Sequence, residues 1–221
     1  LKNSIIQGVS KIINKYHSVI VLEDDLVTSR IFLTFMNQAI NYYKDYNKVF
    51  SISGFSLYLP ELEKLSDDYY FGYRASSWGW GTWLDRWKEI DWDIKDYSHF
   101  KFSILDQIKF MRGGSDMPFM LRNSMNGNID SWAIRWCYNQ FRQNTYTLFP
   151  KKSKVINIGH GENATHTKNK KDYEVDFDLE NKTNFLFSDE IILNKRLNKE
   201  FRAKFSIYNR LKNRLISYVK K

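Results

Sequence analysis

The feature that most constrains the fold is a short apolar run that ends in three consecutive acids. Residues 19–22 (VIVL) are followed directly by Glu23, Asp24 and Asp25. An uninterrupted apolar run of this length predicts a strand buried on both faces, as in a parallel sheet with helices on each side. Open α/β sheets hold their ligands at the carboxyl ends of such strands. The sequence therefore places the three acids at the expected ligand-binding edge.

Two interpretations of these acids remain open from the pattern alone. Adjacent carboxylates repel one another and lose hydration on burial, so a cluster at a strand end favours a divalent cation with oxygen ligands, commonly one that carries a phosphate. The alternative is a solvated loop whose acids favour the positive N-terminus of the next helix.

Composition predicts one globular domain. The chain has 221 residues, of which 43% are hydrophobic and 17% aromatic, enough for a sizeable core. Cys137 is the single cysteine, which excludes an internal disulfide and favours a reducing compartment. No apolar stretch approaches the length of a spanning helix, so we expect a cytoplasmic protein.

The chain opens on a helical pattern. Isoleucine and valine recur at helical spacing over residues 5–13, which predicts an amphipathic helix leading into the first strand. Because such a helix is normally a crossover between parallel strands, we expect at least one strand-helix unit upstream of residue 1.

The next segments are expected to complete a strand-helix-strand unit. A helix is predicted from Ser29 to about Tyr46, with Thr28 or Ser29 as its cap. Residues 48–53 (KVFSIS) then form a second strand, which Gly54 ends. Residues 55–75 are expected to be irregular.

All seven tryptophans fall between Trp78 and Trp136. Four of them occur in residues 74–87 (RASSWGWGTWLDRW), among glycines and small residues. Such tryptophans commonly form a small core of their own. The other interpretation is an apolar wall beside the acidic strand end, on which a sugar ring stacks.

Two later segments carry candidate polar groups. Asp130 precedes a predicted helix, where it either caps that helix or acts as a general base whose pKa partial burial raises. After a short predicted strand at residues 155–158, His160 lies on a glycine-rich loop that ends near His166. These histidines are either surface residues or ligands of a metal or phosphate.

The C-terminal region carries the excess charge. Residues 194–221 contain ten Lys or Arg and one acid, and their apolar residues recur every three or four positions without Pro or Gly. This predicts a basic amphipathic helix, which suits an anionic membrane surface. The alternative is a terminal helix packed on the core with a solvated basic face. The apolar stripe and the lack of a base-reading motif disfavour nucleic acid as a partner.

Taken together, these segments resemble bacterial glycosyltransferases of the GT-A fold found with polysaccharide assembly. They are more distantly similar to the eukaryotic N-acetylglucosaminyltransferase that begins complex N-glycans. The order VIVLEDDL, SISGFS, RASSWGWGTWLDRW, NIDSWAIRW and FPKKSKVINIGHGENATHT carries the resemblance, which covers roughly residues 1–168. It implies an α/β fold with a mixed, mostly parallel sheet flanked by helices, truncated at the N-terminus and followed by the C-terminal amphipathic helix.

The resemblance also implies a metal and nucleotide site. Asp25 matches the carboxylate that binds a divalent ion, Mn²⁺ or Mg²⁺, on the diphosphate of a sugar nucleotide. Glu23 and Asp24 are placed toward the ribose and the waters of the metal. The stretch that holds His160 and His166 is like the loop that closes near the diphosphate, so either histidine is a candidate metal ligand.

The same resemblance assigns the reacting groups. Asp130 falls on the catalytic base, although Ile129 and Ser131 replace the family's first Trp and second Asp around it. The substrate-binding candidates are Trp78, Gly79, Trp80 and Trp132.

The function implied is metal-dependent, inverting glycosyl transfer from a nucleotide-diphosphate sugar to a saccharide or lipid-linked acceptor in surface polysaccharide assembly. Two other classes stay open: a non-catalytic carbohydrate-binding protein and a metal-dependent phosphoryl-transfer enzyme. We expect a catalytic domain at residues 1–170, a connecting segment at 171–193 and the basic tail at 194–221. The tail would hold the enzyme peripherally on the inner membrane face.

Overall fold

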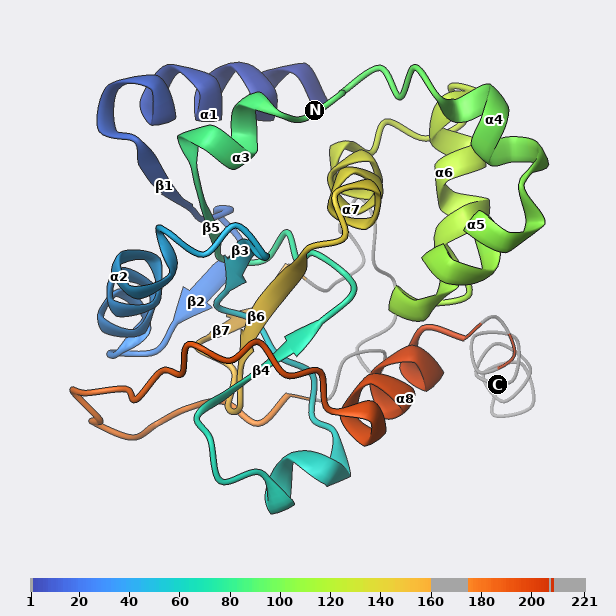
Figure 1. Ribbon diagram of the computed structural model, residues 1–221. Helices are drawn as coiled ribbons and strands as arrows, with labels where there is room; N and C mark the ends of the chain where they lie inside the picture. The colour runs from blue at the N-terminus through green and yellow to red at the C-terminus, as the bar shows by residue number, and fades with distance from the viewer. Residues whose placement is uncertain (1, 160–174, 207, 209–221) are drawn as a thin grey trace.

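The computed structural model describes residues 2–159, 175–206 and 208 (Figure 1). In this part of the chain a five-stranded mixed sheet lies at the centre, with helices on both faces. In order across the sheet its strands are β1 (Ser18–Val21), β5 (Trp80–Trp83), β3 (Val49–Ser53), β6 (Tyr146–Pro150) and β4 (Tyr69–Gly72). A separate antiparallel pair consists of β2 (Leu26–Thr28) and β7 (Val155–Asn157).

Helices form the layers around the sheet. The α-helices are α1 (Lys2–Tyr16), α2 (Phe32–Tyr43), α3 (Leu84–Lys88), α4 (Tyr97–Phe102), α5 (Ile104–Phe110), α6 (Met117–Met125), α7 (Trp132–Arg142) and α8 (Lys195–Lys204). Two short 3-10 helices are η1 (Pro60–Lys64) and η2 (Met111–Gly113). Within the described ranges, none of the helices combines the length and hydrophobicity that crossing a bilayer requires.

The predicted α/β class is confirmed, but the prediction of a mostly parallel sheet is wrong. Among the described strands β3 and β6 are the one parallel pair, and the other neighbours in the sheet are antiparallel. The difference arises at β5, a strand that the sequence did not predict. Because β5 runs between β1 and β3 in the opposite direction, it makes both of those pairings antiparallel.

The first strand also differs from its prediction. β1 lies at one end of the strand order and is half-buried along its length, not buried on both faces. α1 packs beside it and buries Val9 and Ile13, as the helical spacing predicts. β1 and β3 still point the same way, because each is antiparallel to β5.

Two clusters of apolar side chains lie on the two faces of the sheet. β3 is fully buried and contributes to both. Ile52 belongs to the cluster under α2, whereas Phe50 belongs to the cluster under α7 and contacts Trp136 with ring centroids 4.2 Å apart.

α2 begins later than predicted and without a side-chain cap. Its N-cap is Ile31, so Thr28 and Ser29 do not cap it. Both residues are instead held by the β2–β7 pair: Thr28 lies opposite Val155, and the Ser29 N–H donates to the Lys154 carbonyl at 2.8 Å.

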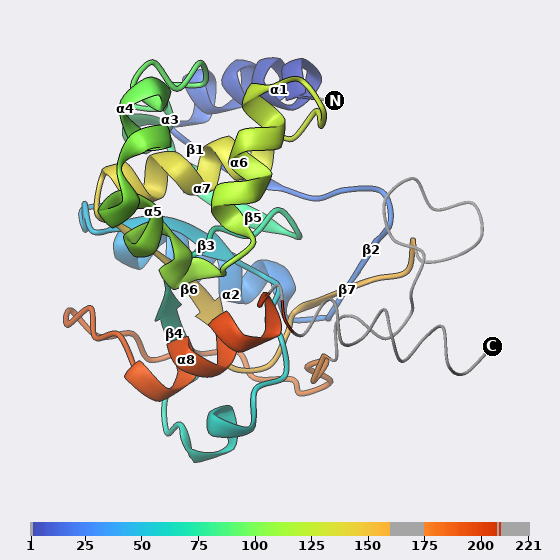
Figure 2. The same ribbon diagram turned by 90° about the vertical axis from the view of Figure 1, so that its right-hand side faces the viewer.

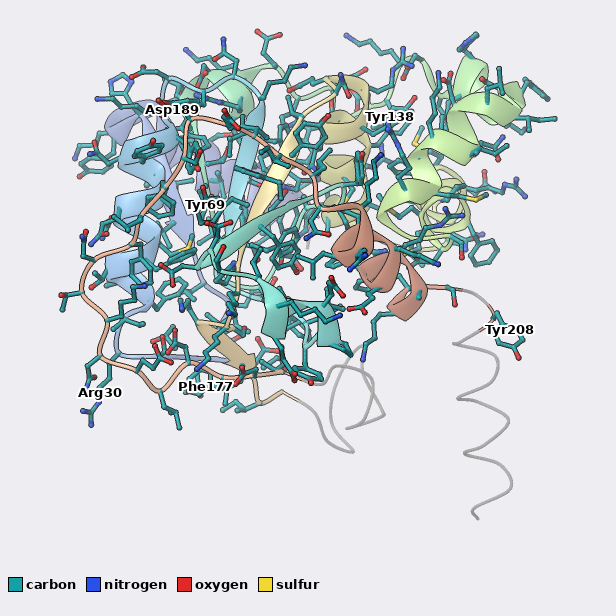
Figure 3. All side chains as sticks on the ribbon, turned by 60° about the horizontal axis from the view of Figure 1, so that its bottom comes forward. Arg30, Tyr69, Tyr138, Phe177, Asp189 and Tyr208 are labelled. Atoms are coloured by element: carbon teal, nitrogen blue, oxygen red, sulfur yellow. The ribbon has the colours of Figure 1, made fainter. Side chains whose placement is uncertain are left out.

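Residues 175–193 pack along α2 (Figure 3). The Tyr42 hydroxyl donates to Asp189 at 2.6 Å, and the Tyr43 hydroxyl donates to the Ser188 carbonyl at 2.9 Å. From the sheet, the Tyr69 hydroxyl accepts from the Ser188 N–H at 2.8 Å. This segment therefore joins α2 to β4.

The apolar stripe of α8 faces the core. Leu197 and Phe201 are buried, and the Phe201 ring packs on Phe149 of β6 at 5.4 Å. Asn198 donates to the Phe71 carbonyl of β4 at 3.2 Å. For this part of the tail, the interpretation that the stripe faces lipid is wrong, and the packed-helix alternative holds. Residues 207 and 209–221 lie outside the described residues.

Candidate functional site

The three acids lie in the turn between β1 and β2. The turn closes with a hydrogen bond from the Leu26 N–H to the Glu23 carbonyl at 3.3 Å. β2 then pairs with β7, with Leu26 opposite Asn157. The pairing brings β7, far away in the sequence, against the acidic turn (Figure 2).

Asp25 is held in place by β7. The Asn157 side-chain amide donates to Asp25 Oδ2 at 2.8 Å, and the Ile158 N–H donates to the Asp25 carbonyl at 2.9 Å. The Gly159 backbone closes over the carboxylate so tightly that a Cβ there would lie 2.5 Å from Oδ2. Among the described residues, the other oxygen, Asp25 Oδ1, is buried and accepts no hydrogen bond.

The neighbouring acids repel each other. Burial raises the pKa of the Glu23 carboxyl, and the negative charges of Asp25 and then Asp24 raise it further. Asp24 itself is exposed. A bound cation would relieve the repulsion that raises this pKa.

Residues 74–79, which precede β5 and which we call the tryptophan-glycine loop, meet the acidic turn at the same sheet edge. In the antiparallel register Val21 lies opposite Trp80, so the residues after β1 lie beside those before β5. Ser53 also lies opposite Trp80, which brings the end of β3 to this edge. This juxtaposition is one of the two interpretations that the sequence left open for the tryptophans, and the register of β5, which was not predicted, produces it.

Gly79 makes the close approach possible. Its φ of 57° is in the left-handed region that favours glycine, and its carbonyl accepts from the Gly54 N–H at 2.5 Å. An added Cβ would lie 2.9 Å from Val155 Cγ1 and 3.4 Å from Leu22 Cδ2. The loop is therefore packed between β7 and the residue that precedes the acids.

The predicted substrate-binding tryptophans separate into two groups. Trp78 is half-buried at the site edge, and its ring meets Phe55 edge-on at 4.7 Å. Trp80 and Trp132 are 0% and 3% exposed, and their rings pack together at 5.1 Å. A side chain with no exposed face cannot stack on a sugar, so for these two the core alternative is correct. The same core contains Trp87, Trp92 and Trp136.

Asp130 contacts the N-terminal end of α1 and does not cap α7. The N-cap of α7 is Ser131, whose hydroxyl accepts from the Ile134 N–H at 3.4 Å. Asp130 is exposed and accepts from the Lys2 N–H at 3.2 Å. The hydrogen bond from the Lys2 N–H helps to lower the pKa of Asp130 below its ordinary value. This is opposite to the rise expected from burial: the carboxylate is ionised at neutral pH, but a lowered pKa makes it a weaker base.

The two candidate histidine ligands, His160 and His166, lie outside the described residues. Within residues 2–159, 175–206 and 208, no group of three or more His, Cys, Asp and Glu side chains is arranged to hold a metal. The donors present still fit a hard divalent cation. Asp25 and Glu23 offer carboxylate oxygens, one of them buried without a partner, and oxygen is the donor that Mn²⁺ and Mg²⁺ prefer.

Asn157 is a site residue that sequence analysis missed. It was assigned only to a short strand, because its hydrogen bond joins it to Asp25, which lies 132 positions away in the sequence. The one local signal is a polar residue within the apolar run at 155–158.

A cavity lies at the other end of the strands. It measures about 770 Å³ and is bordered by residues that precede β1, β3 and β6, namely His17, Asn47 and Gln143. Its remaining wall carries both basic and acidic side chains, including Arg86 and Asp85, which pair with each other. The cavity has no contact with the acidic turn.

No family model matches the chain, and a search of curated proteins finds no significant match. Its fold defines it as an α/β protein with a mixed, mainly antiparallel sheet. The resemblance to GT-A glycosyltransferases rests on the motifs alone.

Proposed function

We propose that the chain is a metal-dependent, inverting glycosyltransferase that uses a nucleotide-diphosphate sugar. The observation that carries this proposal is the meeting of the acidic turn and the tryptophan-glycine loop at one sheet edge, fixed by the pairing of Val21 with Trp80. The buried, unpartnered Oδ1 of Asp25 supports a cation at this edge.

Each residue of the edge has a role in the proposal. Asp25, oriented by Asn157, holds a divalent ion, Mn²⁺ or Mg²⁺, and that ion offsets negative charge on the leaving diphosphate. Glu23 and Asp24 are directed to the ribose and to water molecules of the site. Trp78 covers the donor sugar together with Gly79 and limits access of water, so that transfer outcompetes hydrolysis. His160 and His166, which lie outside the described residues, remain candidate ligands.

Asp130 is the proposed general base. Its carboxylate removes the proton from the attacking acceptor hydroxyl. The acceptor oxygen forms a bond to the anomeric carbon as the bond to the diphosphate oxygen breaks, and the electron pair leaves with the nucleoside diphosphate. One displacement of this kind inverts the configuration. Asp130 belongs to the segment before α7 and contacts α1, so substrate would have to bridge α7 and the acidic turn.

The acceptor is a saccharide or a lipid-linked saccharide of surface polysaccharide assembly. The proposal locates the enzyme in the cytoplasm at the inner membrane face, where a lipid-linked acceptor and a nucleotide sugar meet. This part rests on the resemblance of the motifs.

Calorimetry with Mn²⁺ and a panel of nucleoside diphosphates tests the proposal against its two alternatives. Diphosphate binding that requires Mn²⁺ and is lost in Asp25→Asn supports the transferase. Binding of free saccharide without metal or nucleotide supports a carbohydrate-binding protein. Release of inorganic phosphate from the nucleotide, with no sugar transferred, supports phosphoryl transfer. Asp93→Asn, which alters an exposed acid outside the acidic turn, is the matched control.

A further inference from the structure

Two short helices, α4 and α5, carry an exposed apolar surface that the proposed function does not use. Four large side chains within residues 102–108 define this apolar patch. Their exposed fractions are 78% for Phe102, 72% for Ile104, 71% for Leu105 and 56% for Ile108. Soluble surfaces rarely gather apolar side chains of this size, and such gatherings mark interaction sites.

The patch is the outer face of a well-anchored pair of helices. On the inner face Phe100 and Phe110 are buried against Tyr138 of α7, with ring centroids 5.0 and 5.6 Å away. Ser103 caps α5 by accepting from the Asp106 N–H at 3.2 Å. Because the inner contacts are already made, the patch cannot turn inward without unpacking Phe100 and Phe110.

Exposed basic side chains flank the patch along the chain. Lys101, Lys109 and Arg112 are exposed, and the ammonium group of Lys101 lies 5.4 Å from the centroid of the Phe102 ring. The nearby acids Asp96 and Asp106 face Arg142 of α7, at 2.9 and 3.9 Å. These two acids therefore pair with the charge of Arg142. The basic side chains that form the rim of the patch, Lys101, Lys109 and Arg112, keep their positive charge.

We infer that the α4–α5 patch docks on the surface of an anionic lipid bilayer. Apolar side chains with a basic rim match this occupant, because the side chains enter the headgroup boundary while lysine and arginine remain beside the phosphates. A second copy of the chain fits less well. A two-fold dimer would place one basic rim against another, and like charges repel.

The inference shares the membrane location of the proposed function, but it is argued from the patch alone and uses neither the acidic turn nor the basic tail. In Figure 2, α4 and α5 lie to the left and the β2–β7 pair lies to the right, so the patch and the acidic turn are on different sides. Docking through the patch leaves the acidic turn accessible.

Co-sedimentation with vesicles tests the inference in the full chain, with the tail intact in every variant. The vesicles contain equal phosphatidylglycerol and phosphatidylcholine, or phosphatidylcholine alone. Phe102→Ser combined with Leu105→Gln should lower partition to the anionic vesicles by about tenfold or more. Lys101→Gln combined with Lys109→Gln should weaken binding at low salt and have little effect at high salt.

Leu179→Gln is the matched control, since Leu179 is 82% exposed but lies outside the patch. It should bind as the unaltered chain does. Unchanged partition of the Phe102 and Leu105 variant, with its thermal melt intact, would overturn the inference. A dimer in solution that dissociates in the same variant would overturn it too, in favour of a second copy.

Discussion

The side-chain amide of Asn157 donates to Oδ2 of Asp25 at 2.8 Å, joining residues 132 positions apart. The bond fixes one carboxylate oxygen and leaves the buried Oδ1 without a partner among the described residues. Buried carboxylate oxygens normally accept a hydrogen bond, so an unpartnered one beside two further acids lowers the stability of the folded chain. A cation bound to this oxygen would offset that loss of stability.

Asp25→Asn should abolish Mn²⁺ binding and metal-dependent turnover while leaving the fold intact. An amide is a poorer ligand than a carboxylate for a hard cation, and it can still accept from Asn157. Titration calorimetry with Mn²⁺ and a thermal melt measure the two effects. Full activity of the variant at saturating Mn²⁺ would remove Asp25 from the site.

Glu23→Gln should change how stability depends on pH. The pKa of Glu23 is raised in the folded chain, so the folded chain keeps a proton that the unfolded chain releases near the ordinary value of 4.5. Between 4.5 and the raised pKa, the free energy of unfolding therefore falls as pH rises. Glu23→Gln should lack this fall. Denaturant melts across this pH window compare the two chains, and parallel pH profiles would contradict the prediction.

Local patterns in the sequence were sufficient for some elements. The helical spacing of residues 5–13 predicted α1, and the apolar run at 48–53 predicted β3. The strand β5 was missed because its glycine suggested a loop. Gly81 instead allows close packing: a Cβ there would lie 2.9 Å from the Val19 carbonyl oxygen and 2.7 Å from Ile40 Cδ1. The need for glycine at position 81 arises from contacts with residues distant in the sequence, so the local sequence cannot reveal it.

The candidate site was predictable only in part for a similar reason. Strand-end position pointed to Asp25 and its neighbours, but the fate of each tryptophan depends on long-range packing. Trp78 and Trp80 are two residues apart, yet one lies at the site edge and the other in the core. Composition cannot separate them, because both follow small residues and flank the same glycine.

Ser131→Ala should lower stability and spare turnover, whereas Asp130→Asn should lower turnover and spare stability. Ser131 caps α7, so its loss should cost about 1 kcal/mol of unfolding free energy and leave turnover nearly normal. Asp130→Asn should change stability little and lower turnover about a hundredfold or more, with donor binding retained. Thermal melts beside single-turnover rates measure both. An active Asp130→Asn variant would exclude the base assignment.

Trp80→Ala should destabilise the chain far more than Trp78→Ala. Trp80 is 0% exposed and packs on Trp132 and Trp136, so truncation leaves a cavity that costs about 3–5 kcal/mol. Trp78 is only half-buried, and its loss should weaken donor binding more than folding. Denaturant unfolding and donor titration separate the two effects. Equal destabilisation of both variants would place Trp78 in the core as well.

Lys154→Met should be strongly destabilising through the partner it leaves behind. Lys154 and Asp178 form an ion pair with side chains 3% and 4% exposed, and burial lowers the pKa of Lys154. Removing the lysine leaves a buried carboxylate unpaired, which costs about 3–5 kcal/mol. Lys154→Met combined with Asp178→Asn should recover much of this loss, because the amide carries no charge and still accepts from the Glu180 N–H. A double-mutant cycle by denaturant unfolding measures the coupling, and strictly additive losses would show that the two charges do not stabilise each other.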